Sequence, residues 1–112
     1  MKQVGNAGMS KLIETYEKEF DTEASNNQLY NALIFAAQKS GASLYQTAKH
    51  EFYPHGMTAF VILGESHVAL HSFPEKKCVW VQLSTCTDLI KADVFFDLFL
   101  NAIEKNIVES RL

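Results

Sequence analysis

Side chains suited to nucleophilic and acid–base chemistry gather between residues 64 and 75, which read Gly-Glu-Ser-His-Val-Ala-Leu-His-Ser-Phe-Pro-Glu. Two carboxylates, two hydroxyls and two imidazoles lie in this short stretch. Its pattern predicts a strand, and the period of two places four residues on one side: His67, Ala69, His71 and Phe73. Taken alone, histidines on a strand are more often structural or surface residues than catalytic ones, so the pattern needs support from elsewhere in the chain.

Two further blocks provide that support. Residues 50–58 read His-Glu-Phe-Tyr-Pro-His-Gly-Met-Thr, and residues 85–87 read Thr-Cys-Thr, with Cys86 fifteen residues after His71. Together the blocks resemble prokaryotic-type S-adenosylmethionine decarboxylases. That family usually reads A-E-S-H-(I/L)-(S/A)-I-H-T-W-P-E at its processing site, T-C-G after it and F-H-x-F-x-P-x-G-(V/M)-T-G before it. Several blocks with matching gaps are more specific than one motif, and the resemblance covers roughly residue 25 to the end.

The chain departs from the family pattern in three places. The N-terminal run G-x-H-x-x-x-D-x-Y-x-C is poorly kept, Phe73 replaces the family's tryptophan, and Gln82 replaces an aspartate. The resemblance is therefore to a divergent member, and substrate identity is where divergence would show.

The resemblance implies that the chain is a self-processing zymogen. Ser66 Oγ would attack the Glu65 carbonyl to form an ester, and β-elimination would then leave a pyruvoyl group on residue 66. The family's base for this step corresponds to His71, and Thr58 stands where the family keeps an assisting hydroxyl. Gly64 would allow a backbone geometry that larger residues resist. The products would be residues 1–65 and 66–112.

The same resemblance implies roles in turnover. The pyruvoyl carbonyl, the only cofactor, would bind the substrate amine as a Schiff base and act as an electron sink while carbon dioxide leaves. Cys86 matches the proton donor, and an ordinary thiol is mostly protonated at neutral pH. Phe52 matches the ring that stacks on adenine, Glu75 the carboxylate that binds the ribose hydroxyls, and Glu65 lines the same pocket.

Each role has a plainer structural alternative. Ser66 could be an ordinary strand serine, and Cys86 a small buried apolar residue. Phe52 could belong to the core, and Glu75 could be a solvated turn residue. Glu65, His71 and Cys86 in register with Ser66 favour the catalytic interpretation.

Three functions follow from these alternatives. The first is S-adenosylmethionine decarboxylation, which supplies the aminopropyl donor for spermidine and so for polyamine biosynthesis. The second is a pyruvoyl-dependent lyase for another amino acid, such as arginine or ornithine. The third is an inactive homologue that only binds a partner, and the joint presence of Ser66, His71 and Cys86 argues against it.

The elements expected around these residues give an α+β fold. Ser25 is a good N-cap for a helix to Lys39, and Ser40-Gly41 ends it. A second helix capped by Asp88 would run to about residue 109, with an apolar face of Val94, Phe95, Leu98, Phe99, Ala102 and Ile103. Strands are expected at 12–16, 43–53 and 58–63, then, after Gly64-Glu65 interrupts, at 66–72 and 78–85. We expect a two-layer sandwich of roughly β-α-β-β-β-α order, with an antiparallel sheet and both helices on one face.

Composition and charge limit the kinds of molecule that the chain is expected to bind. The chain has 112 residues, a net charge of −3 and no basic run, which argues against nucleic-acid binding. We expect one domain spanning 1–112, no membrane segment or secretory signal, a cytoplasmic location and no metal site, because the histidines and cysteines lack ligand spacing. Cys78 and Cys86 lie on one predicted strand, too far apart for a disulfide. A sheet face without helices predicts a homodimer.

Overall fold

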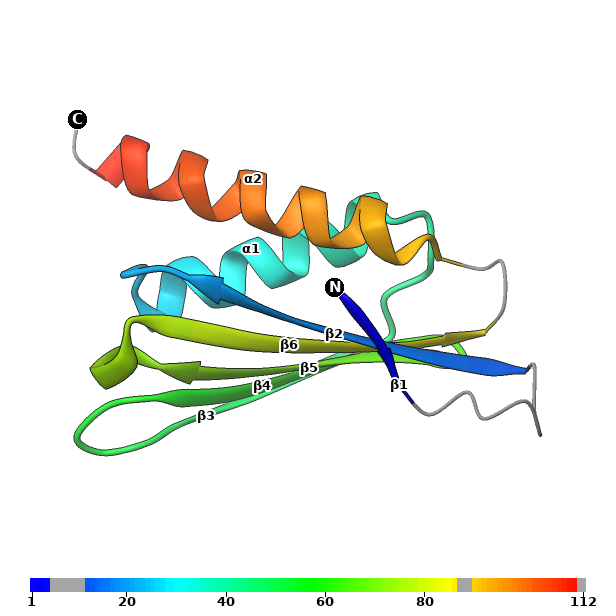
Figure 1. Cartoon of the computed structure of the whole chain (residues 1–112), viewed down its shortest axis with the longest axis horizontal. Helices are drawn as coiled ribbons and strands as arrows, with labels where there is room; N and C mark the ends of the chain where they lie inside the picture. Colours follow the sequence, from blue (N-terminus) through cyan, green and yellow to red (C-terminus); the bar gives the residue numbers. More distant parts are fainter. Residues whose placement is uncertain (5–11, 87–89, 111–112) are drawn as a thin grey trace.

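The computed structural model describes residues 1–4, 12–86 and 90–110, and within them six strands form one antiparallel sheet (Figure 1). The strand order is β1-β2-β6-β5-β4-β3. Hairpins join β3 to β4, β4 to β5 and β5 to β6, so the chain segment with the candidate chemistry forms the middle of the sheet. The strands are β1 (Lys2–Val4), β2 (Ile13–Asp21), β3 (Gln46–Glu51), β4 (Met57–Leu63), β5 (Ser66–Phe73) and β6 (Cys78–Cys86).

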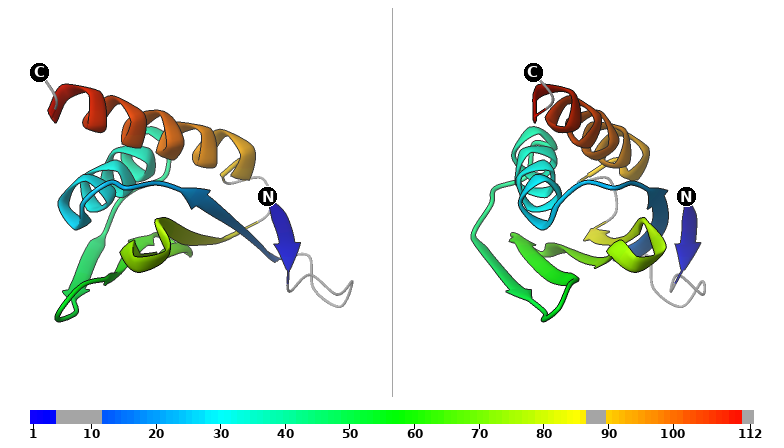
Figure 2. Two further views of the ribbon diagram at one scale, coloured as in Figure 1. Left: turned by 60° about the vertical axis from the view of Figure 1, so that its left-hand side comes forward. Right: turned by 90° about the vertical axis from the view of Figure 1, so that its left-hand side faces the viewer.

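Both long helices, α1 (Asn26–Lys39) and α2 (Ala92–Ser110), lie on the same side of this sheet (Figure 2). Ser25 is the N-cap of α1, and its side chain accepts a hydrogen bond from the backbone N–H of Gln28. The Gln28 side chain in turn accepts one from the Ser25 N–H, which completes a capping box. Neither helix is long and apolar enough to cross a membrane. The predicted α+β two-layer sandwich is therefore confirmed.

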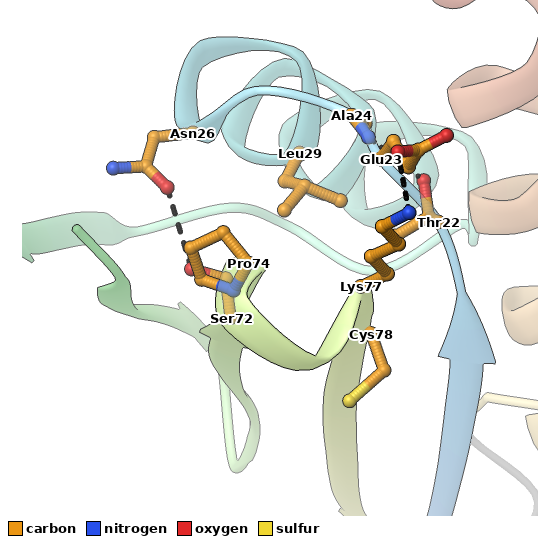
Figure 3. Close-up of a pocket in the computed structure, with 9 residues that line it drawn as sticks. All are labelled: Thr22, Glu23, Ala24, Asn26, Leu29, Ser72, Pro74, Lys77 and Cys78. Atoms are coloured by element: carbon orange, nitrogen blue, oxygen red, sulfur yellow. Dashed lines mark hydrogen bonds and ion pairs between the residues drawn. The ribbon is translucent and has the colours of Figure 1, made fainter.

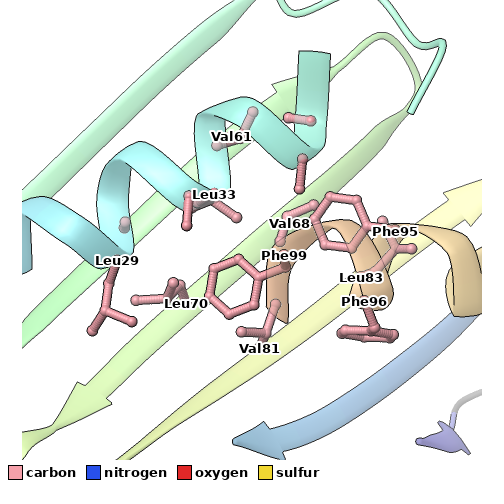
Figure 4. Packing of buried hydrophobic residues seen from close by; sticks show 14 of the residues in the cluster. Leu29, Leu33, Val61, Val68, Leu70, Val81, Leu83, Phe95, Phe96 and Phe99 are labelled. Carbon is pink, nitrogen blue, oxygen red and sulfur yellow. The ribbon is translucent and has the colours of Figure 1, made fainter. Parts of the chain in front are cut away.

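The core fills the space between helices and sheet (Figure 4). On α1 the residues that face the sheet are buried: Leu29, Ala32, Leu33, Ala36 and Ala37. On α2 the prediction is wrong at Val94, which is 47% exposed, and it omitted Phe96, which is buried. Phe96 and Phe99 both contact the Phe20 ring of β2, with centroids 6.1 and 5.3 Å apart. Because α2 packs on α1 and on the sheet together, its buried arc is wider than one stripe.

The element order differs from the predicted one in its strands. Four strands separate the helices, where the order β-α-β-β-β-α allows three. The four lie at the ranges expected from the sequence, and Gly64-Glu65 turns the chain between β4 and β5 as expected. β2 runs to Asp21, well past residue 16, because it pairs with β6 along its whole length. β1 adds a further strand. The predicted cap Asp88 lies outside the described residues, and α2 is assigned from Ala92.

The sheet face away from the helices has no covering element among the described residues. It carries the odd-numbered residues of β5 and the even-numbered residues of β6, which alternate with the core residues. Phe60 stacks on His67 at 5.2 Å, and His71 lies 5.3 Å from the Trp80 ring. This face, called here the open face, therefore presents aromatic and imidazole rings where an exposed sheet would normally be charged.

Candidate active site

The Glu65–Ser66 bond lies where a tight turn enters β5. Leu63 and Ser66 pair across the hairpin, so only Gly64 and Glu65 form the loop. Gly64 has φ +62°, the positive value that the first position of a II′ hairpin turn requires. A residue with a Cβ would be strained there. The glycine thus fixes the position of the bond that follows.

Ser66 is buried, and its hydroxyl is held by two neighbours on β6. Ser66 Oγ donates to Thr85 Oγ1 at 3.0 Å and accepts from the Cys86 N–H at 3.3 Å. Thr85 Oγ1 in turn donates a hydrogen bond to the Cys86 carbonyl oxygen at 3.2 Å. Sequence reasoning gave Thr85 no role, although it stands in the matched T-C block. An oxygen oriented by an N–H and by a second hydroxyl is well placed for attack on the adjoining carbonyl.

Cys86 lies at the end of β6, next to the same bond. Its Sγ is 3.4 Å from Glu65 Oε2 and 3.9 Å from the Glu65 carbonyl oxygen. Partial burial raises the pKa of the Cys86 thiol above its ordinary value, and the hydrogen bond to Glu65 and that carboxylate's negative charge raise the pKa further. The thiol is therefore protonated at neutral pH, which suits a proton donor. We call Glu65, Ser66, Thr85 and Cys86 the cleavage group.

A second group forms at the other end of β5. Thr58 on β4 pairs with His71 on β5, and Thr58 Oγ1 lies 3.0 Å from His71 Nδ1. This contact leaves Nε2 of the imidazole for another partner. Both side chains point to the open face, where the Trp80 ring flanks the imidazole.

A surface pocket of about 220 Å³ adjoins this pair. Phe52 lines it with half its surface exposed, and its ring meets His50 edge-on at 4.7 Å. Glu75 also lines it, with Oε2 3.1 Å from His55 Nε2. His55 is exposed and also lines the pocket. Thr58, His71, Phe52 and Glu75 are called here the pocket group.

The two groups do not meet within one chain. Ser66 and His71 are five residues apart on β5, which corresponds to about 16 Å at about 3.3 Å per residue. The odd spacing also turns the two side chains to opposite faces: Ser66 faces the helices and His71 the open face. The structure therefore assembles two half-sites from the predicted residues. Residues within each group contact one another, but the nucleophile Ser66 and the base His71 lie in different groups.

Comparison with known proteins gives these groups a context. Residues 10–111 match the family model described as S-adenosylmethionine decarboxylase. The chain is 33% identical over 99 residues to S-adenosylmethionine decarboxylase proenzyme 2 of Bacillus cereus (strain ZK / E33L), covering 88% of this chain and 80% of that protein. It is 32% identical over 104 residues to the proenzyme 2 of Bacillus anthracis, covering 93% and 85%.

The solved structures include a protein with the same fold. The adenosylmethionine decarboxylase from Aquifex aeolicus superposes with a TM-score of 0.70 at 21% identity, covering 85% of this chain and 82% of that one. At this identity the likeness speaks for the fold alone. The sequence matches confirm the resemblance that the blocks around residues 52, 66 and 86 predicted.

Proposed function

The chain belongs to the S-adenosylmethionine decarboxylase family, and from this premise we propose that it is a self-processing, pyruvoyl-dependent lyase that decarboxylates S-adenosylmethionine. The product would be the aminopropyl donor for spermidine synthesis. The observation that carries the proposal is the cleavage group: a buried, oriented Ser66 hydroxyl beside its own Glu65 carbonyl, with Cys86 in contact. The relatives described above are all named as proenzymes for this substrate, and none of them supports arginine or ornithine.

The first step makes the active group from the chain itself. Ser66 Oγ attacks the Glu65 carbonyl carbon, and the amide becomes an ester as the C–N bond breaks. A base then removes the Ser66 α-proton. The Cβ–Oγ bond of residue 66 breaks, and the oxygen leaves as part of the Glu65 carboxylate. The dehydroalanine left on residue 66 takes up water and releases ammonia to give the pyruvoyl group. The hydrogen bond from Ser66 Oγ to Thr85 Oγ1 and the one from the Cys86 N–H to Ser66 Oγ support this step by holding Oγ in place.

The residues around the cut suit the group that would form there. A pyruvoyl carbonyl condenses with a substrate amine as a Schiff base and accepts the electron pair left when carbon dioxide departs. Cys86, protonated by virtue of its raised pKa, lies where a proton could be returned to carbon. Burial and the Glu65 carboxylate, whose Oε2 lies 3.4 Å from Sγ, both raise the pKa of that thiol.

A homodimer would unite the two groups. The open face carries apolar and aromatic side chains in a chain of 112 residues, and an exposed face of this kind favours association. A two-fold axis near the middle of β5 would set one protomer's cleavage group against its partner's pocket group. His71 would then act as the processing base across the interface, with Thr58 fixing its ring. This arrangement resolves the separation of Ser66 from His71.

The pocket group suits an adenosine. Phe52 offers a half-exposed ring for stacking, and Glu75 offers carboxylate oxygens for a ribose diol. The negative charge of Glu75 also suits a cationic sulfonium. We place the single-domain enzyme in the cytoplasm, where Cys78 and Cys86, both free, stay reduced.

Intact-mass spectrometry of the purified protein tests this function first. Two pieces are expected, residues 1–65 and 66–112, the second beginning with a ketone that blocks Edman sequencing. Ser66→Ala should remain one chain, because no oxygen is left to attack. Processed enzyme should release carbon dioxide from carboxyl-labelled S-adenosylmethionine faster than from labelled arginine or ornithine. An uncut wild-type chain after prolonged incubation would reject the pyruvoyl mechanism, and faster release from an amino acid would reject the substrate.

A further inference from the structure

Asn26 at the start of α1 forms hydrogen bonds with three separate segments of the chain. Figure 3 shows one of these bonds, to Ser72, in a separate pocket that Asn26 itself lines. Its Nδ2 donates to Glu51 Oε1 at 3.2 Å and to the Gly56 carbonyl oxygen at 3.4 Å. Its Oδ1 accepts from Ser72 Oγ at 3.3 Å. One amide therefore joins the end of β3, the 52–56 loop and the end of β5.

We propose that Asn26 is a positioning residue for substrate binding, which rests on the function proposed above. It does not line the pocket that holds Phe52 and Glu75, so it would act through its three partners.

Each partner stands next to a residue of the pocket group. Glu51 precedes Phe52, and Ser72 follows His71 directly and leads through Phe73 towards Glu75. Gly56 closes the loop between them, because its carbonyl oxygen also accepts from the Phe52 N–H at 2.9 Å. Releasing the Asn26 amide would free the stacking ring relative to the strand that carries the other contacts.

The presence of asparagine at position 26 is better explained by its three hydrogen bonds than by the needs of the helix. Asn26 is the first residue of α1, where a carboxylate would interact favourably with the helix dipole. The first turn of α1 nevertheless contains no acidic residue. Only an amide supplies two donors and an acceptor on one rigid group, as the three partners of Asn26 require.

The substitution Asn26→Asp separates the hydrogen-bonding role of this residue from its role at the start of α1. The substitution is isosteric and keeps the acceptor for Ser72, but it removes both donors and sets a carboxylate against Glu51. We expect KM for S-adenosylmethionine to rise about threefold to tenfold, the effect of losing one or two hydrogen bonds. The kcat per processed chain should change less than KM. The melting temperature should fall only slightly, because the favourable interaction of an acid with the helix dipole partly offsets the two lost hydrogen bonds and the repulsion from Glu51.

The matched control is Asn27→Asp, the same chemical change one residue along on an exposed position, which should leave KM unchanged. Adding Glu51→Gln to Asn26→Asp restores a donor–acceptor pair in the opposite direction and should bring KM part of the way back. Asn26→Ala, which removes all three hydrogen bonds, should raise KM at least as much as Asn26→Asp.

The outcomes are distinguishable from failure of the proposed function. If wild-type enzyme does not release carbon dioxide from S-adenosylmethionine, the function is wrong. If wild type is active but both Asn26 variants keep KM within about twofold, the positioning role is wrong. A KM that rises equally in Asn27→Asp, or a double variant no better than Asn26→Asp, would also overturn it.

Discussion

The separation of Ser66 from His71 leads to a prediction that can be tested by mixing two inactive chains. Within one protomer the two side chains are about 16 Å apart along β5 and on opposite faces, given about 3.3 Å per strand residue. Proton abstraction requires a heavy-atom separation of about 3 Å. A base acting within its own chain is therefore out of reach by a wide margin, and in the proposed homodimer the base would come from the partner.

The perturbation is co-expression of Ser66→Ala and His71→Ala chains that carry tags of different length. Each should stay largely uncut alone, the first for lack of a nucleophile and the second for lack of a base. In a mixed dimer of the proposed arrangement, the cleavage group that holds an intact Ser66 would lie next to the intact His71 of the other chain. Random pairing of equal amounts makes about half of the dimers mixed, so about half of the His71→Ala chains should be cut.

Denaturing gels read the result directly, since only the His71→Ala chain can yield fragments. The control pairs His71→Ala with the double variant Ser66→Ala/His71→Ala, which offers no base and should leave both chains intact. Light scattering should show about twice the protomer mass in every mixture. Dimers without any cleavage in the first mixture would refute the shared site.

Further predictions concern turnover. Cys86→Ala should still be cut, but it should turn over about 10²- to 10⁴-fold more slowly, which is the usual contribution of general acid catalysis. Full activity of this variant in steady-state assays would show that Cys86 is not the proton donor. Because the pKa of the Cys86 thiol is raised, kcat should hold up to a pH above the ordinary pKa of a thiol and decrease only beyond it. Glu65→Gln removes the negative charge beside the thiol, so the decrease in kcat should begin at a lower pH. Phe52→Ala and Glu75→Gln should raise KM for S-adenosylmethionine more than they lower kcat, and the reverse pattern would contradict their assignment to binding.

Sequence reasoning succeeded where the signal was local. The capping residues of α1 and the turn at Gly64 could be predicted because each depends on a few neighbouring residues. β2 was predicted too short because its outward positions are charged, so that only pairing with β6 shows its length. Val94 was misassigned because the buried arc of α2 depends on where α1 lies.

The candidate site shows the same division. The matched blocks brought Ser66, His71 and Cys86 together as a set, but they could not show which of these lie side by side. One signal was available: an odd spacing of five on a strand places Ser66 and His71 on opposite faces. The role of Thr85 depends on a cross-strand contact, and that of Asn26 on contacts between residues 25 to 46 positions apart. No local pattern predicts either.

The hairpin between β4 and β5 has a consequence for reversibility. Once the Glu65–Ser66 bond is cut, β4 with α1 belongs to one polypeptide and β5 with α2 to another, held together by the strand pairing and the shared core. Folding before the cut is unimolecular, but reassembly after it requires two chains to meet. Recovery of the mature protein from denaturant should therefore depend on protein concentration, whereas recovery of uncut Ser66→Ala should depend on it less. Maturation thus turns a chain that can regain its fold by itself into two chains that must meet before they can refold.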